Sequence, residues 1–388
     1  MADTLTLARV GNARSPWVNG FAWDALWLQS ALWLVPVALL LASGYENPDD
    51  SPLDLMVFGL TALFWIGHRF GSSWLAYATT AYRPLVRAEP MRFVVVPIVI
   101  TATCFAILLP ADDVLPLTRA ERVLALATLD FLFVTYHFAA QHFGVLSLYR
   151  VRSATPNVWT RRLDRLFALT VGGALVVVVE AITETNLFRE LWLPSWFDLD
   201  ALAELSAGLR TIAMVLLSCL TLVSIIWEAR ATEVSLPRVL YIAGVTLMVG
   251  GALYMEHPFL FVSVWTAQHW LVATALTTRI ACAEPGASSS AFSRLLHAVN
   301  RRPWALLVVL ALLSVLLLPI MEVEAVRIDG TYYGDRIFGT LAVALRESEW
   351  VPALVALGFA TAFLHYWLDR AVYRLSRPGV RTAARGLL

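Results

Sequence analysis

The sequence predicts an all-α fold, a polytopic integral-membrane bundle of about ten transmembrane helices that forms a single domain over residues 1–388. Three observations predict it. First, 59% of the 388 residues are hydrophobic and only 15% are charged, which excludes an ordinary soluble domain. Second, apolar runs long enough to cross the hydrocarbon layer as helices recur along the chain. Third, arginine-rich and acid-rich connections alternate between these runs.

The length of each apolar run supports a membrane-spanning helix. A helix needs about 20 apolar residues to cross roughly 30 Å of hydrocarbon, and each run approaches or exceeds that length. The second and the fourth run are longer, so we expect these two helices to tilt or to extend beyond the membrane. In chain order, the expected helices cover residues 21–43, 53–82, 91–110, 119–149, 163–185, 205–228, 236–254, 257–281, 303–321 and 349–374.

The charges of the connections predict the topology. Arginine accumulates in short cytoplasmic loops, and basic and acidic connections alternate through the ten runs. The acidic connections are YENPDDSPLD, residues 111–113, residues 184–204 and the loop that follows residue 321. The termini and the other connections carry the arginines, among them Arg9, Arg83, Arg150, Arg230, Arg279 and Arg374. We therefore expect both termini in the cytoplasm and the chain in a membrane of the bacterial inner (cytoplasmic) type.

Other features narrow the classes of partner and site. The three cysteines are widely spaced and form no CxxC pair, so a disulfide framework or a thiolate metal site is not expected. The formal net charge is zero. The expected partners are the lipid bilayer and a lipophilic small molecule, and no nucleic-acid partner is expected.

Five of the seven histidines fall at one depth. On the expected topology they lie on helices that run from outside to inside, between eight and fifteen residues before the next cytoplasmic arginine. At 1.5 Å per residue they occupy a slab of roughly 10 Å, from mid-membrane into the cytoplasmic half. Ionisable groups in a membrane usually face the bundle interior and mark a site, and imidazole is a preferred ligand of iron, zinc and copper. The predicted metal ligands are therefore His68, His137, His142, His269 and His365.

The spacing of His137 and His142 limits what the two can do together. Five residues place them roughly 140° apart on an ideal helix, so they do not both ligate one metal unless the helix bulges. Two arrangements remain on a regular helix: two metal ions with one histidine each, or one metal with the second histidine in an outer shell. A metal-bound histidine usually donates its other N–H to an outer partner, and the expected outer partners are Gln141, Gln268, Asp369 and Asp130.

Three further residues are predicted to bind substrate. Arg69 follows His68 directly at mid-membrane, where it needs a carboxylate, a carbonyl or an acidic substrate group. Asp130 is the candidate counter-ion for Arg69. Phe138 and Trp265, beside the histidines, are expected to line an apolar channel.

Three histidine segments carry a resemblance to a known family. GHRFGSSW around His68, YHFAAQHFG around His137 and His142, and PFLFVSVWTAQHWL around His269 resemble the histidine segments of the Brp/Blh-type membrane β-carotene dioxygenases. That family is polytopic, holds non-haem iron with histidines from several helices, and cleaves a polyene with O₂. The resemblance implies that His68, His142 and His269 are iron ligands, with His137 as a possible fourth.

The resulting hypothesis is a histidine-ligated non-haem iron oxygenase or dioxygenase in the membrane. It would use Fe(2+), in a mononuclear or dinuclear site, and O₂ as co-substrate. The expected substrate is lipophilic: a polyene, an isoprenoid or a lipid. Two alternatives remain open from the sequence, a proton-coupled transporter in which the intramembrane polar groups form a relay and a haem protein with paired axial histidines.

Overall fold

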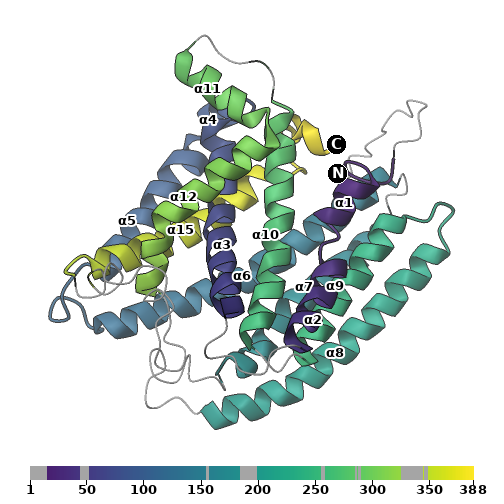
Figure 1. Cartoon of the computed structure of the whole chain (residues 1–388), viewed down its shortest axis with the longest axis horizontal. Coiled ribbons are helices and arrows are strands. Elements are labelled where there is room, and N and C mark those ends of the chain that lie inside the picture. The colour runs from purple at the N-terminus through teal and green to yellow at the C-terminus, as the bar shows by residue number, and fades with distance from the viewer. Residues whose placement is uncertain are drawn as a thin grey trace.

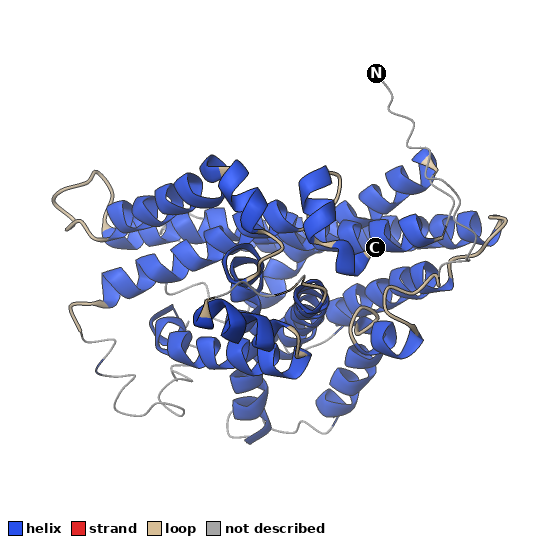
Figure 2. Cartoon of the chain, turned by 90° about the horizontal axis from the view of Figure 1, so that it is seen from above, coloured by secondary structure: helices blue, strands red, loops and turns tan. Residues whose placement is uncertain are grey.

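The chain is described by a computed structural model that covers residues 15–43, 52–153, 157–183, 199–254, 258–284, 286, 290–324, 344 and 348–388. Every regular element in these ranges is a helix (Figure 2). The predicted all-α class is therefore confirmed. Most of the acidic connections expected on the outer side fall in residues 44–51, 184–198 and 325–343, which lie outside the described ranges.

The helices follow the predicted order closely. The longer ones are α2 (Ala31–Ser43), α3 (Pro52–Ala78), α5 (Val96–Leu108), α6 (Arg119–Arg152), α7 (Val158–Thr183), α8 (Leu199–Ala229), α9 (Leu236–Tyr254), α10 (Pro258–Cys282), α11 (Ala291–Asn300), α12 (Pro303–Glu324) and α15 (Val351–Val372). The short ones are α1 (Phe21–Leu26), α4 (Arg83–Ala88), the π-helical turn η2 (Met91–Val95), α16 (Pro378–Ala383) and η3 (Arg385–Leu387). A capping box of Thr118 and Glu121 starts α6, because each side chain satisfies a backbone N–H of the other.

Two local features differ from the sequence prediction. The run at 21–43 is not one helix, since α1 ends at Leu26 and α2 begins at Ala31. Polar side chains support the break: Asp24 accepts hydrogen bonds from the backbone N–H groups of Val18 and Asn19 at 2.8 and 2.9 Å. The second difference is α11, a helix within a connection for which the sequence predicts only a cytoplasmic position.

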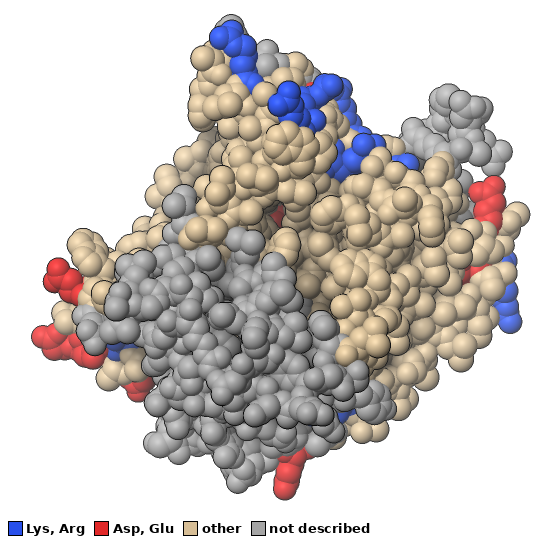
Figure 3. Space-filling model, in the orientation of Figure 1, with Lys and Arg blue, Asp and Glu red and all other residues tan. Residues whose placement is uncertain are grey.

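Four described helices are long and apolar enough to cross a membrane, by length and composition. They are Met91–Leu108, Arg119–Arg152, Gly208–Ala229 and Val351–Val372. A fifth span is possible if the bent pair α11 and α12 counts as one. On the face drawn in Figure 3, basic side chains gather at the top, acidic ones stand at the left and lower edges, both kinds occur at the right edge, and uncharged surface lies between. These features support an integral membrane protein.

Close helix packing places α3 at the centre of the molecule. In Figure 1, α3 and α10 run side by side, and α3 also packs against α12 and α15. The GxxxG pattern of Gly67 and Gly71 permits this approach. A Cβ atom on Gly67 would lie 2.8 Å from Ser314 Oγ on α12, and one on Gly71 would lie 2.7 Å from Thr277 Oγ1 on α10. The two glycines therefore set the distance between the helix that carries His68 and its neighbours.

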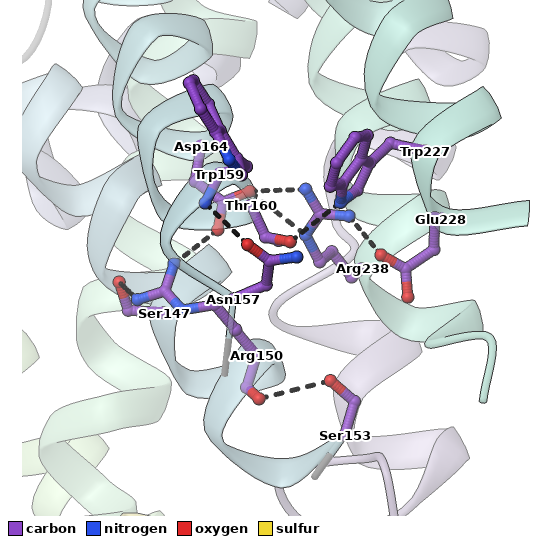
Figure 4. Close-up of polar contacts among 10 residues, drawn as sticks. All are labelled: Ser147, Arg150, Ser153, Asn157, Trp159, Thr160, Asp164, Trp227, Glu228 and Arg238. Atoms are coloured by element: carbon purple, nitrogen blue, oxygen red, sulfur yellow. Dashed lines mark hydrogen bonds and ion pairs between the residues drawn. The ribbon is translucent and has the colours of Figure 1, made fainter. Parts of the chain in front are cut away.

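A buried network of four charged side chains joins α6 to the helices on its other side (Figure 4). Arg238 of α9 donates to Asp164 of α7 at 2.6 Å and forms a short ion pair with Glu228 of α8. Arg150 of α6 donates to the second oxygen of Asp164 at 2.6 Å. Two arginines and two carboxylates balance in charge, which makes their burial tolerable. The network fixes the end of α6 that lies beyond the histidines.

Candidate metal centre

Four buried histidines meet in the centre of the bundle. Each comes from a different helix: His68 from α3, His137 from α6, His269 from α10 and His365 from α15. One ring nitrogen from each lies within 4.8 Å of the others. The Nε2 atom of His137 is 3.1 Å from Nε2 of His269 and 3.1 Å from Nε2 of His365. The ring of His68 packs edge-on against His365 and His269, with centroids 4.5 and 4.9 Å apart.

These separations fit a metal-ion cage. Two nitrogens bound about 2.1 Å from one metal at a right angle lie about 3.0 Å apart, and about 3.4 Å apart at the tetrahedral angle. The observed 3.1 Å from His137 to His269 and to His365 falls between these values. Neutral imidazoles that present lone pairs to one point repel each other without a cation. The donor set is all-nitrogen and suits iron, zinc, copper or nickel.

Gln141 orients the ring of His269. Its side-chain oxygen accepts a short hydrogen bond from Nδ1 of His269, and its amide nitrogen donates to the backbone carbonyl of His269 at 2.8 Å. A neutral imidazole carries one proton. The proton on Nδ1 therefore leaves the lone pair of Nε2 directed toward the other histidines, which is the arrangement that a metal ligand requires. The structure thus brings Gln141 to the place expected of an outer partner.

Asp369 lies against two of the histidines. It is four residues after His365 on α15, and its Oδ1 is 3.4 Å from Nδ1 of His365. Its Oδ2 is 3.6 Å from Nε2 of His137. Among the described residues no hydrogen bond reaches Nδ1 of His365, and Asp369 is the carboxyl group that lies next to it, at the place of an outer partner.

The structure places His142 outside the group. Helix α6 stays regular through this region, so the five-residue spacing turns His142 away from His137. Its Nδ1 pairs with the hydroxyl of Tyr241 on α9 at 2.8 Å. Among the described residues, His142 makes no hydrogen bond to the four clustered histidines, and its buried Nε2 has no hydrogen-bond partner. Gln268, the other expected outer partner, is buried, and its amide lies beside the hydroxyl of Tyr241, which is also the partner of His142.

Arg69 and Asp130 form a polar edge beside the histidines. Nη1 of Arg69 donates to Thr361 Oγ1 at 3.3 Å, and the guanidinium lies over the ring of Trp65, 4.7 Å from its centroid. Arg69 and Asp130 interact electrostatically, but among the described residues no ion pair within 4.0 Å joins them. Asp130 is connected to the cluster through Tyr366, because its carboxyl group accepts a hydrogen bond from the Tyr366 hydroxyl.

Aromatic side chains enclose the cluster. The ring of Phe138 stacks on His269 with centroids 4.3 Å apart, and Trp265 packs edge-on against Phe138 at 6.3 Å. Tyr366 lies 5.1 Å from His137 and 5.6 Å from His365, centroid to centroid. The sequence did not predict a role for Tyr366 or Tyr241. The one sequence signal for Tyr366 is that it directly follows His365.

Comparison of the chain with protein-family models, with curated proteins and with solved structures finds no match. The chemistry of the site therefore has to be argued from its own residues.

Proposed function

We propose that the protein is a membrane-embedded, histidine-ligated non-haem iron oxygenase that uses O₂ on a lipophilic substrate, a polyene, an isoprenoid or a lipid. The observation that carries the proposal is the convergence of His68, His137, His269 and His365 from four helices. We place the chain in the membrane with ten spans and cytoplasmic termini, since all ten apolar runs contain helix. The choice of iron rests on the resemblance of the histidine segments to the β-carotene dioxygenases.

The residues around the cluster fit one metal ion better than two. Two-metal sites hold their ions about 3.5–4 Å apart and need ligands for both. The described residues supply four histidine nitrogens and one nearby carboxylate, Asp369. Four imidazoles leave coordination positions open, and a bound iron would supply the redox chemistry that activates O₂ there.

The chain's own residues then bind and orient the substrate. Phe138 and Trp265 provide an apolar wall on one side of His269. Arg69 offers a positive charge near His68 and His365, and this charge can hold an oxygen-bearing end of a substrate. The buried aromatic surroundings exclude water from the reaction, which protects reactive species from side reactions.

The spacing of His137 and His269 disfavours this pair as the axial ligands of a haem. Two axial ligands on opposite sides of a metal, each about 2.1 Å away, lie about 4.2 Å apart with the porphyrin between them. The Nε2 atoms of His137 and His269 are 3.1 Å apart. Such nitrogens fit neighbouring positions around a metal.

Elemental analysis of the purified full-length chain tests the metal, with His142→Ala as a matched control. We expect one iron per chain in the wild type, its loss in His137→Ala and His269→Ala, and its retention in His142→Ala, whose ring bonds to Tyr241 instead. Incorporation of ¹⁸O from ¹⁸O₂ into a polyene, an isoprenoid or a fatty-acyl lipid tests the reaction. A wild type without stoichiometric metal, or equal metal loss in all three variants, contradicts the proposal.

A further inference from the structure

Helix α11 turns sharply away from the membrane-crossing direction. Ser290 caps its first residue, Ala291, and its hydroxyl accepts a hydrogen bond from the backbone N–H of Ser293 at 3.1 Å. The helix ends at Asn300. Its axis is bent by 106° from that of the first part of α12. When α12 runs across the membrane, α11 therefore lies close to the membrane plane. In Figure 1, α11 is at the end of the molecule where α12 begins.

The side of α11 that contacts the protein is mostly polar, although Val299 at its edge packs against the hydrophobic core. Asn300 accepts a hydrogen bond from Trp74 Nε1 at 2.7 Å and donates to Glu284 at 2.7 Å and to the carbonyl of Ala78 at 3.2 Å. On the same side, Ser293 is buried and accepts from Arg83 at 3.4 Å. These bonds fix the rotation of α11 about its axis, so the residues on its other side are held outward.

The outward side of α11 is apolar and is bordered by arginines. Phe292 and Leu295 are 68% and 61% exposed. Trp304, at the start of α12, is 63% exposed. Arg294 within α11 is exposed as well, and so are Arg301 and Arg302 directly after it. A helix at a water-facing surface buries its apolar side and exposes its polar side. The reversed orientation of α11 indicates that its outer surroundings are apolar and that charged groups are near.

We propose that α11 lies in the headgroup region of the cytoplasmic leaflet, with Phe292 and Leu295 in the acyl boundary and Arg301 and Arg302 bound to anionic lipid headgroups. Amphipathic helices with arginine and large apolar side chains bind membranes in this way. Tryptophan is enriched at the same depth, which accounts for exposed Trp304. Each arginine near an anionic leaflet favours binding by about fivefold. The two arginines together therefore select anionic over zwitterionic lipid by about 25-fold.

Site-directed spin labelling of the full-length chain tests the depth of α11. A nitroxide on the Leu295→Cys variant is compared, in lipid nanodiscs, with one on the Thr382→Cys variant, which labels an exposed residue of α16. Cys219 and Cys282 are first replaced by serine. We expect the label at 295 to be reached better by oxygen than by a water-soluble nickel complex, and the label at 382 to show the reverse. A water-exposed label at 295 would mean that this face does not lie in the lipid. That result overturns the proposal, as does a label at the bilayer centre, which would make α11 part of a broken span.

Lipid composition tests the role of the arginines. Replacing part of the phosphatidylcholine with phosphatidylglycerol should move the label at 295 deeper, and the pair Arg301→Gln and Arg302→Gln should abolish that shift. The matched control is Arg230→Gln, which removes an exposed charge in the connection between α8 and α9 and should leave the shift unchanged. An equal shift with and without the two arginines contradicts the assignment of anionic headgroups.

Discussion

Replacing Gln141 with methionine removes the hydrogen-bonding partner of one metal-ligand candidate without removing the ligand itself. The oxygen of Gln141 accepts from Nδ1 of His269, and its amide nitrogen donates to the His269 carbonyl at 2.8 Å. Methionine has a similar length and fills the same space, but it offers no comparable acceptor. The variant therefore leaves the Nδ1 proton of a buried ring without a partner, or allows the proton to move to Nε2, where it blocks metal binding.

The size of the effect follows from the burial of His269. Loss of an outer partner typically lowers metal affinity by 10–100-fold, which corresponds to about 1.4–2.7 kcal/mol. His269 is 1% exposed, so water does not replace the lost amide. We therefore expect a loss of about 30–100-fold for Gln141→Met. Gln141→Glu keeps an oxygen acceptor and should bind metal at least as tightly as the wild type.

Competition with a chromophoric chelator measures the affinity of the metal-stripped, full-length chain. Gln268→Met is the matched control, because Gln268 is also buried and precedes His269 directly, while its amide lies beside the hydroxyl of Tyr241 and, among the described residues, is not bonded to a ring of the cluster. We expect its affinity to stay within about threefold of the wild type. Equal losses in the two glutamine variants, or unchanged affinity in Gln141→Met, would refute the orienting role of Gln141.

Three further predictions concern packing and linkage. Gly71→Val inserts atoms where a Cβ already lies 2.7 Å from Thr277 Oγ1, so it should lower the free energy of unfolding by about 1–3 kcal/mol, and Thr277→Ala should restore part of the loss in a thermal denaturation assay. Arg238→Met leaves Asp164 and Glu228 without their shared partner and should cost about 3–5 kcal/mol, while Arg230→Met at an exposed site should change stability by less than about 0.5 kcal/mol. Removal of metal with a chelator should lower the unfolding temperature, and added metal should restore it, because a ligand that binds the folded state stabilises it.

The meeting of the histidines was predictable from two simple counts. Apolar run length gave the helices, and the number of residues to the next arginine gave the depth of each histidine. Both quantities depend on local sequence and on the membrane, so they are readable without the fold. Four of the five histidines at that depth, His68, His137, His269 and His365, come together.

Depth does not determine the direction in which a side chain points. His142 lies at the same depth as the others, but its position around the α6 axis carries it to Tyr241. The 140° separation from His137 was calculable, whereas the choice of which histidine faces the centre depends on how α6 packs against its neighbours. The resemblance to the dioxygenase segments favoured His142 over His365, and the structure brings His365 to the cluster instead.

The break between α1 and α2 and the presence of α11 were not predictable by hydropathy. Residues 21–43 are uniformly apolar enough to read as one helix, and the break depends on Asp24 and on Gln29, which donates to Pro237 at 2.8 Å. That partner is more than 200 positions away in the chain. Helix α11 is too short and too polar to register as a span, and its orientation follows from bonds made by Asn300 to distant residues.

Because metal binding stabilises the folded state, it is also coupled to the packing of the bundle. The cluster draws one side chain from each of α3, α6, α10 and α15, so binding a metal there favours the arrangement in which the four helices are in contact. Thermodynamic coupling is reciprocal. A change that separates α3 from α10, such as Gly71→Val, must weaken metal binding by the same free energy by which metal loss weakens that helix contact. The GxxxG pattern of α3 therefore belongs to the metal centre energetically, although neither glycine contributes a ligand.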